Sequence, residues 1–79
     1  MTTRRVKLTY PEELIKEPLL ARLVRDHDVT PNIRRANVEE HVGWIVCELD
    51  GAPDAVGRAI DWLREVGVQV DPLEDVIES

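Results

Sequence analysis

The side chains best suited to binding a small polar molecule gather in residues 29 to 51, VTPNIRRANVEEHVGWIVCELDG. A groove for a zwitterionic amino acid needs a donor for the carboxylate, an acceptor for the ammonium group and an apolar slot. Each buried polar group left unpaired costs roughly 1 to 3 kcal/mol. The asparagines and arginines offer the polar part, and an isoleucine or tryptophan offers the slot. The expected ligand-binding residues are Asn32, Ile33, Arg34, Asn37 and Trp44, with Arg35 beside them.

The same residues also have ordinary structural explanations. Asn32, which follows Pro31, could hold its own backbone in a turn. The two arginines could be solvated charges that protect an edge strand from aggregation. Ala36 and Val38 would need a bulge to return to the core parity of Ile33. Ligand binding and a purely structural role therefore both stay open for these residues at this point.

Other reactive side chains have simpler structural roles. Cys47 stands at a predicted core-facing strand position, where cysteine behaves as a small hydrophobe. His27 lies between two aspartates at a predicted helix end, where a protonated imidazole favours the helix dipole. His41 follows two glutamates in a turn, and such close neighbours cannot all converge on one metal ion. We therefore expect no catalytic residue, cofactor or metal, and the chain is not expected to be an enzyme.

The charge and the apolar runs limit the partners and the location. A formal net charge of -6 would repel nucleic acid and anionic lipid, and the chain has no phenylalanine to stack on bases. The longest mostly apolar run, VGWIVCEL, is too short to span a membrane. The first ten residues, MTTRRVKLTY, contain no apolar core of a signal peptide. The expectation is a cytoplasmic protein with no membrane insertion and no nucleic-acid partner.

Hydrophobic periodicity predicts six elements in 79 residues. Strands are expected at 4–10, 31–38, 43–50 and 67–71, with helices at 18–27 and 53–66. The first helix has an apolar stripe that includes Leu20, Leu23 and Val24, and the second begins at Pro53 and ends at Gly67. The expected core is Leu8, Leu20, Leu23, Ile45, Leu49, Ile60 and Leu63. Residues 1–73 form one domain, and residues 74–79 are expected to be an acidic C-terminal tail.

Two βαβ halves with right-handed crossovers fold most simply into one α+β sandwich. We therefore expect the ferredoxin-like βαββαβ fold, in which a four-stranded antiparallel sheet carries both helices on one face. The other face has no helical cover. At 79 residues only about 60% of the unfolded surface can be buried, so the core must be thin.

Strand parity predicts an apolar patch on the uncovered face. If Ile45, Cys47 and Leu49 face the helices, then Trp44 and Val46 point away from them. Contiguous exposed apolar surface usually marks an interface or a binding groove. Two-fold self-association would cover it, with Lys7 pairing with Glu48 at the rim. A loop or the tail folding over Trp44 is the alternative.

Nearly the whole chain, from TYPEELIKEPLLARLV to REVGVQV, resembles the NIL domain family. The matching elements are the EPLLARLVRD helix, Asn32-Ile33, Ala36-Asn37, Gly43, Gly51, Ala59-Ile60, Leu63 and Gly67-Val68. NIL domains are ferredoxin-like, similar to ACT domains, and occur at the end of methionine-importer ATPases, in ferredoxin fusions and alone. The resemblance implies methionine binding that restrains transport, or a link to sulfur incorporation into homocysteine.

Two departures from the family bear on these expectations. Arg34 takes the place of the leucine of the eponymous motif, and the chain carries neither an ATPase nor a cysteine cluster. We therefore expect neither regulation in cis nor electron transfer by this chain. The expected function is a regulatory module that binds methionine or a related sulfur amino acid. The alternative is an assembly module that docks a sulfur-metabolism partner, or another copy, through its open sheet face.

Overall fold

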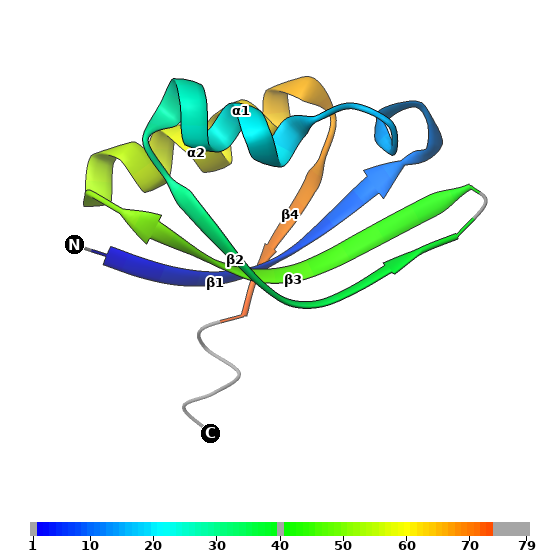
Figure 1. Ribbon diagram of the computed structural model, residues 1–79, viewed down its shortest axis with the longest axis horizontal. Helices are drawn as coiled ribbons and strands as arrows, with labels where there is room; N and C mark the ends of the chain where they lie inside the picture. Colours follow the sequence, from blue (N-terminus) through cyan, green and yellow to red (C-terminus); the bar gives the residue numbers. More distant parts are fainter. Residues whose placement is uncertain (1, 40, 74–79) are drawn as a thin grey trace.

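The computed structural model describes residues 2–39 and 41–73. Its elements, in chain order, are β1 (Thr2–Pro11), the short 3-10 helix η1 (Glu12–Leu14), α1 (Leu19–His27), β2 (Thr30–Val38), β3 (Val42–Gly51), α2 (Pro53–Val66) and β4 (Gln69–Pro72). The strands form one antiparallel sheet in the order β2-β3-β1-β4. Both helices lie over one face of that sheet (Figure 1). This arrangement confirms the predicted ferredoxin-like sandwich. The predicted tail, residues 74–79, lies outside the described residues.

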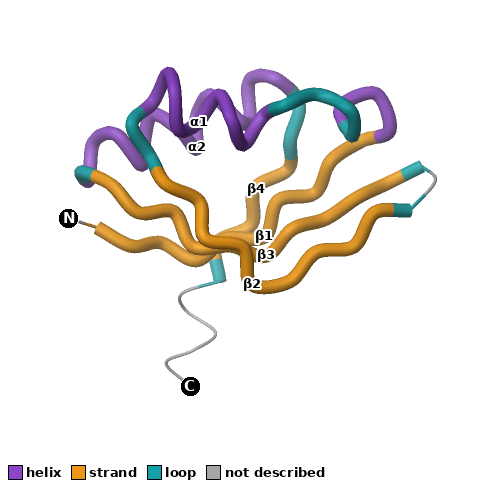
Figure 2. The backbone as a smooth tube through the Cα atoms, in the orientation of Figure 1, coloured by secondary structure: helices purple, strands orange, loops and turns teal. Residues whose placement is uncertain are grey.

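The sheet and the helices form two layers, and no helix of the described residues lies over the second sheet face (Figure 2). The far end of the β2–β3 hairpin diverges from the helical layer (Figures 1 and 2). β2 is an edge strand, and every residue in it except Pro31 is exposed. Side chains of β2 therefore remain available to solvent or to a binding partner.

α2 has the predicted bounds, and α1 begins one residue later than predicted. Pro53 occupies the first turn of α2, and Gly67 ends it with a φ of 110°, a left-handed conformation that glycine adopts at little cost. The Gly67 N–H donates to the carbonyls of Leu63 and Arg64. α1 ends at His27, and the next residue, Asp28, caps it and also has a left-handed φ, of 55°. Pro18 precedes α1 rather than being its first residue.

The core lies between the helices and the sheet. Five of the seven predicted core residues are buried there: Leu8, Leu23, Leu49, Ile60 and Leu63. Leu20 and Ile45 are only partly buried against the cluster, which corrects their assignment to the core. Val24 is 54% exposed and lies outside the stripe that packs on the sheet. The nine residues of α1 present a narrower face than the sequence pattern suggests.

The strand bounds differ from the prediction mainly at the ends of the sheet. β1 begins two residues earlier than predicted because Thr2 and Thr3 pair with the end of β3. β4 begins at Gln69 rather than residue 67 because Gly67 caps α2. The pairing of β2 with β3 shifts between Ile33 and Arg35, as the structural explanation of this stretch required for Ala36 and Val38.

Candidate functional site

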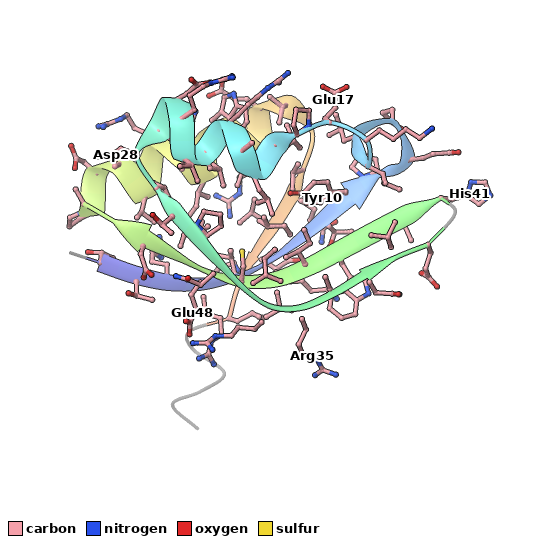
Figure 3. All side chains as sticks on the ribbon, viewed as in Figure 1. Tyr10, Glu17, Asp28, Arg35, His41 and Glu48 are labelled. Carbon is pink, nitrogen blue, oxygen red and sulfur yellow. The ribbon has the colours of Figure 1, made fainter. Side chains whose placement is uncertain are left out.

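The open sheet face carries four of the five predicted binding residues. Asn37 lies opposite Trp44, and Asn32 lies opposite Glu48, in the β2–β3 register. Cys47 and Leu49, on either side of Glu48, are buried under the helices, so Glu48 and its partner Asn32 point to the uncovered side. By the same alternation along β3, Trp44 and its partner Asn37 point there too. Figure 3 shows Glu48 and Arg35 on the side of the sheet opposite the helices.

Ile33 does not share that face. It pairs with Cys47, which is buried, so its side chain lies on the helix-facing side, where it is 54% exposed. The bulge leaves Arg34 without a partner in the ladder and resumes the pairing at Arg35. Both arginines therefore join the open face, and Ile33 cannot form one slot with Trp44.

Glu48 is the centre of an ion-pair network across three strands. Arg5 Nη2 donates to Oε2 at 2.9 Å, and Arg34 donates to Oε1 through Nη2 at 2.8 Å and Nε at 3.2 Å. The hydrogen bonds from Arg5 and then Arg34 hold the pKa of the Glu48 carboxyl below its usual range. Arg34 is thus already paired within the chain.

Lys7 does not pair with Glu48, in contrast to the expected rim contact. Its ammonium group lies 5.3 Å from the centre of the Trp44 ring, a distance at which the ring face attracts a cation. Arg5 and Arg34 occupy both oxygens of Glu48, which explains why Lys7 pairs elsewhere.

Asn32 contacts a neighbouring strand rather than its own backbone. Its side-chain amide donates to Asp50 Oδ2 at 2.5 Å, and the Thr3 hydroxyl donates to Asp50 Oδ1 at 2.5 Å. The local turn considered for Asn32 is therefore replaced by a cross-strand hydrogen bond. The Asp50 carboxylate is held from both sides, by β2 and by β1.

An open cleft of about 630 Å³ lies beside Asn32, at the end of the sheet where β2 begins and β3 ends. Its lining residues are Asp28, Thr30, Asn32, Asp50, Gly51 and Ala52. Two carboxylates, an amide and a hydroxyl thus surround one space, which suits a ligand with an ammonium group. No lysine or arginine is among these lining residues.

Sequence reasoning found only Asn32 in this cleft and missed its two carboxylates. Asp28 follows α1, and Asp50 is the last residue but one of β3, 22 positions further along the chain. Two features of the sequence could have drawn attention to them. One is the aspartate after α1, at a position where glycine often ends a helix, and the other is the Asp-Gly pair at the end of β3. Neither signal indicates that the two residues meet.

Trp44 lines a different and smaller space. A crevice of about 60 Å³ is bordered by Tyr10, Ile15, Val38, Gly43, Trp44 and Ile45, at the other end of β3 from Asp50. The five predicted residues therefore do not converge on one cavity. Asn32 belongs to the polar cleft, and Trp44 belongs to the open face and this crevice.

The cysteine and the two histidines lie in surroundings that give them structural roles. Cys47 is buried, and burial, followed by the nearby Glu48 charge, raises the pKa of its thiol to about 11. The His27 ring lies 4.9 Å from that of Trp62, and His41 Nδ1 lies 3.3 Å from Glu12 Oε2. Within residues 2–39 and 41–73, no three His, Cys, Asp or Glu side chains gather closely enough to hold a metal ion. No helix in these ranges could cross a bilayer.

The family model of the NIL domain matches residues 4–72, almost the whole described chain. The chain belongs to the NIL domain family. Its relatives include the methionine import ATP-binding protein MetN of Myxococcus xanthus, 36% identical over 72 residues that cover 86% of this chain and 22% of that protein. MetN of Chromohalobacter salexigens is 33% identical over 75 residues, covering 90% and 22% respectively.

This NIL domain therefore spans about a fifth of the length of these curated relatives. A solved structure supports the fold independently. It is the C-terminal domain of an ABC transporter ATP-binding protein from Enterococcus faecalis, with a TM-score of 0.78 at 23% identity, and the match covers 90% of this chain and 83% of that one.

Proposed function

We propose that this NIL domain is a non-catalytic regulatory module that binds methionine or a related sulfur amino acid. The observation that carries the proposal is the position of Asn32, the first residue of the family's motif, in a cleft with two carboxylates. The relatives named as methionine import proteins support the choice of ligand. The proposed context of this module is the transport or metabolism of sulfur amino acids.

The cleft has groups for both ends of an amino acid. The carboxylates of Asp28 and Asp50 would accept hydrogen bonds from the ammonium group, and such charge-assisted bonds are the strong ones. The Asn32 amide and the Thr30 hydroxyl would donate to the ligand carboxylate. Because no basic residue lines the cleft, the carboxylate end is held by neutral donors, and we expect modest affinity.

Thermal unfolding with added amino acids tests the proposal. Methionine at ten times its dissociation constant should stabilise the fold by about 1.4 kcal/mol if it binds only the folded state. Asn32→Ala should reduce that shift, whereas Asn37→Ala, on the same strand but not among the cleft residues, should not. The absence of any shift with millimolar methionine, homocysteine, cysteine or cystathionine would contradict it.

The open sheet face supports a second candidate, a docking function. Trp44 and Val46 are only partly buried there, and no described element covers them. A sulfur-metabolism partner protein, a homodimer and a cytoplasmic location, all expected from the sequence, stay predictions. Sedimentation equilibrium checks self-association: a chain that is monomeric at high micromolar concentration would contradict the dimer.

A further inference from the structure

Two basic residues lie on either side of Val46 on the open face. Lys7 on β1 and Arg35 on β2 are both register partners of Val46 on β3. All three side chains point away from the helices, because the neighbours Val6, Leu8 and Cys47 are buried beneath them. The backbones of β1 and β2 lie two strand spacings apart, about 10 Å.

Neither cation is neutralised by a described residue. Arg35 is exposed and forms no ion pair with residues 2–39 or 41–73. Lys7 contacts the Trp44 ring but no carboxylate of the same ranges. Arg5 and Arg34 on this face, by contrast, share Glu48. A chain with a net charge of -6 thus places two positive charges around one apolar patch, and neither has a carboxylate partner within the described ranges.

The centre of the patch is complementary to an apolar side chain. Trp44 and Val46 are partly buried in the centre, and the cations stand at both sides. A partner that fits would place an apolar side chain on Val46 and carboxylates toward Lys7 and Arg35. An apolar centre within a charged rim is the usual anatomy of a protein interface.

We propose that the open face of this NIL domain docks an acidic protein segment in which an apolar side chain lies between two carboxylates. This inference rests on the docking function proposed above and gives the partner its chemistry. A second copy is the competing occupant, but stacking two such faces would bring the Lys7 and Arg35 cations of both copies together, and juxtaposed like charges are costly.

An NMR titration of the ¹⁵N-labelled full chain with three six-residue peptides tests the inference. The peptides alternate valine with glutamate, with lysine or with serine. The glutamate peptide should shift resonances of β1, β2 and β3 around Val46, and its binding should weaken with added salt, since exposed charges are screened within about 10 Å at 0.1 M. The lysine peptide should not bind.

Two double variants separate the patch from overall charge. Lys7→Gln with Arg35→Gln should weaken the glutamate peptide about twofold to thirtyfold, as expected for the loss of two exposed ion pairs. Lys16→Gln with Arg58→Gln removes the same charge from exposed positions elsewhere and should leave binding unchanged. Circular dichroism of both variants checks that the fold is retained.

Each contrary result has a distinct meaning. Equal binding of the serine peptide at the same resonances, or equal weakening by the control variant, overturns the acidic partner and leaves the docking function standing. No binding by any of the three peptides overturns the acidic partner, and the docking function then depends on the sedimentation test of self-association. A dimer that Trp44→Ala dissociates shows that a second copy occupies the face, which also overturns the inference.

Discussion

The side-chain amide of Asn32 on β2 donates a hydrogen bond of 2.5 Å to the carboxylate of Asp50 on β3. The other carboxylate oxygen accepts a hydrogen bond from Thr3 on β1. The family's motif residue is thereby tied to an acid that the sequence did not single out. Both line the same cleft, so Asn32 can act there directly or by orienting Asp50.

The first prediction concerns that carboxylate. Asp50→Asn should weaken methionine binding by about tenfold or more, because a hydrogen bond to a charged group is lost. Asp54→Asn on α2 removes a carboxylate that pairs with Arg58 and does not line the cleft, so it should leave binding unchanged. Isothermal titration calorimetry measures both. Equal binding by wild type and Asp50→Asn would remove Asp50 from the site.

The second prediction concerns the core. Leu23 on α1 is fully buried, so Leu23→Ala should lower the free energy of unfolding by about 2 to 5 kcal/mol through lost burial and a cavity. Val24→Ala, one residue on but 54% exposed, should change it by no more than about 0.5 kcal/mol. Urea denaturation compares the two. A similar loss in both variants would show that the α1 faces are assigned incorrectly.

Most of the fold could be predicted from local patterns. The two-residue period of β1 and the buried stripe of α2 are strong, and Pro53 and Gly67 mark where α2 begins and ends. The errors fall where tertiary packing decides. Val24 satisfies helical spacing, but α1 packs along too narrow a face to bury it. Helical spacing shows which residues share a side, not how wide the contact is.

The candidate site was less predictable. Asn32 came from the family resemblance, whereas Asp28 and Asp50 are brought beside it by the end of α1 and the β2–β3 register. The pairing of Arg34 with Glu48 depends on where the bulge lies, and alternation alone does not determine that position. Contacts across strands therefore needed the structure, although the residues themselves were visible in the sequence.

The third prediction concerns the hydroxyl of Tyr10. The side chain is 6% exposed, and its oxygen has no hydrogen-bond partner in the described part of the chain. An unsatisfied buried polar group costs about 1 to 3 kcal/mol, so Tyr10→Phe should keep or increase stability. Thermal unfolding at pH 7 measures it. A clear loss of stability would show that the hydroxyl has a partner.

The last prediction is loss of stability at alkaline pH. Burial, with a smaller effect of Cys47, raises the pKa of Tyr10 from 10.0 to about 12, and burial raises the pKa of Cys47 from 9.0 to about 11. Both groups bind protons more tightly in the folded chain. Their contribution is fully present below pH 9 and is lost as the pH rises to about 12, because the unfolded chain then releases protons more readily.

Variants of Cys47 and Tyr10 separate their contributions to the loss of stability at alkaline pH. Cys47→Ala should flatten the decline of the unfolding free energy between pH 9 and 11, and Tyr10→Phe should flatten it between pH 10 and 12. The measurement is urea unfolding at intervals of pH, with each variant compared with itself at pH 8. Cys47→Ala also removes a buried sulfur, so its stability at pH 8 sets its baseline. An unchanged slope in Tyr10→Phe would mean that the phenol ionises equally readily in the folded and unfolded chains.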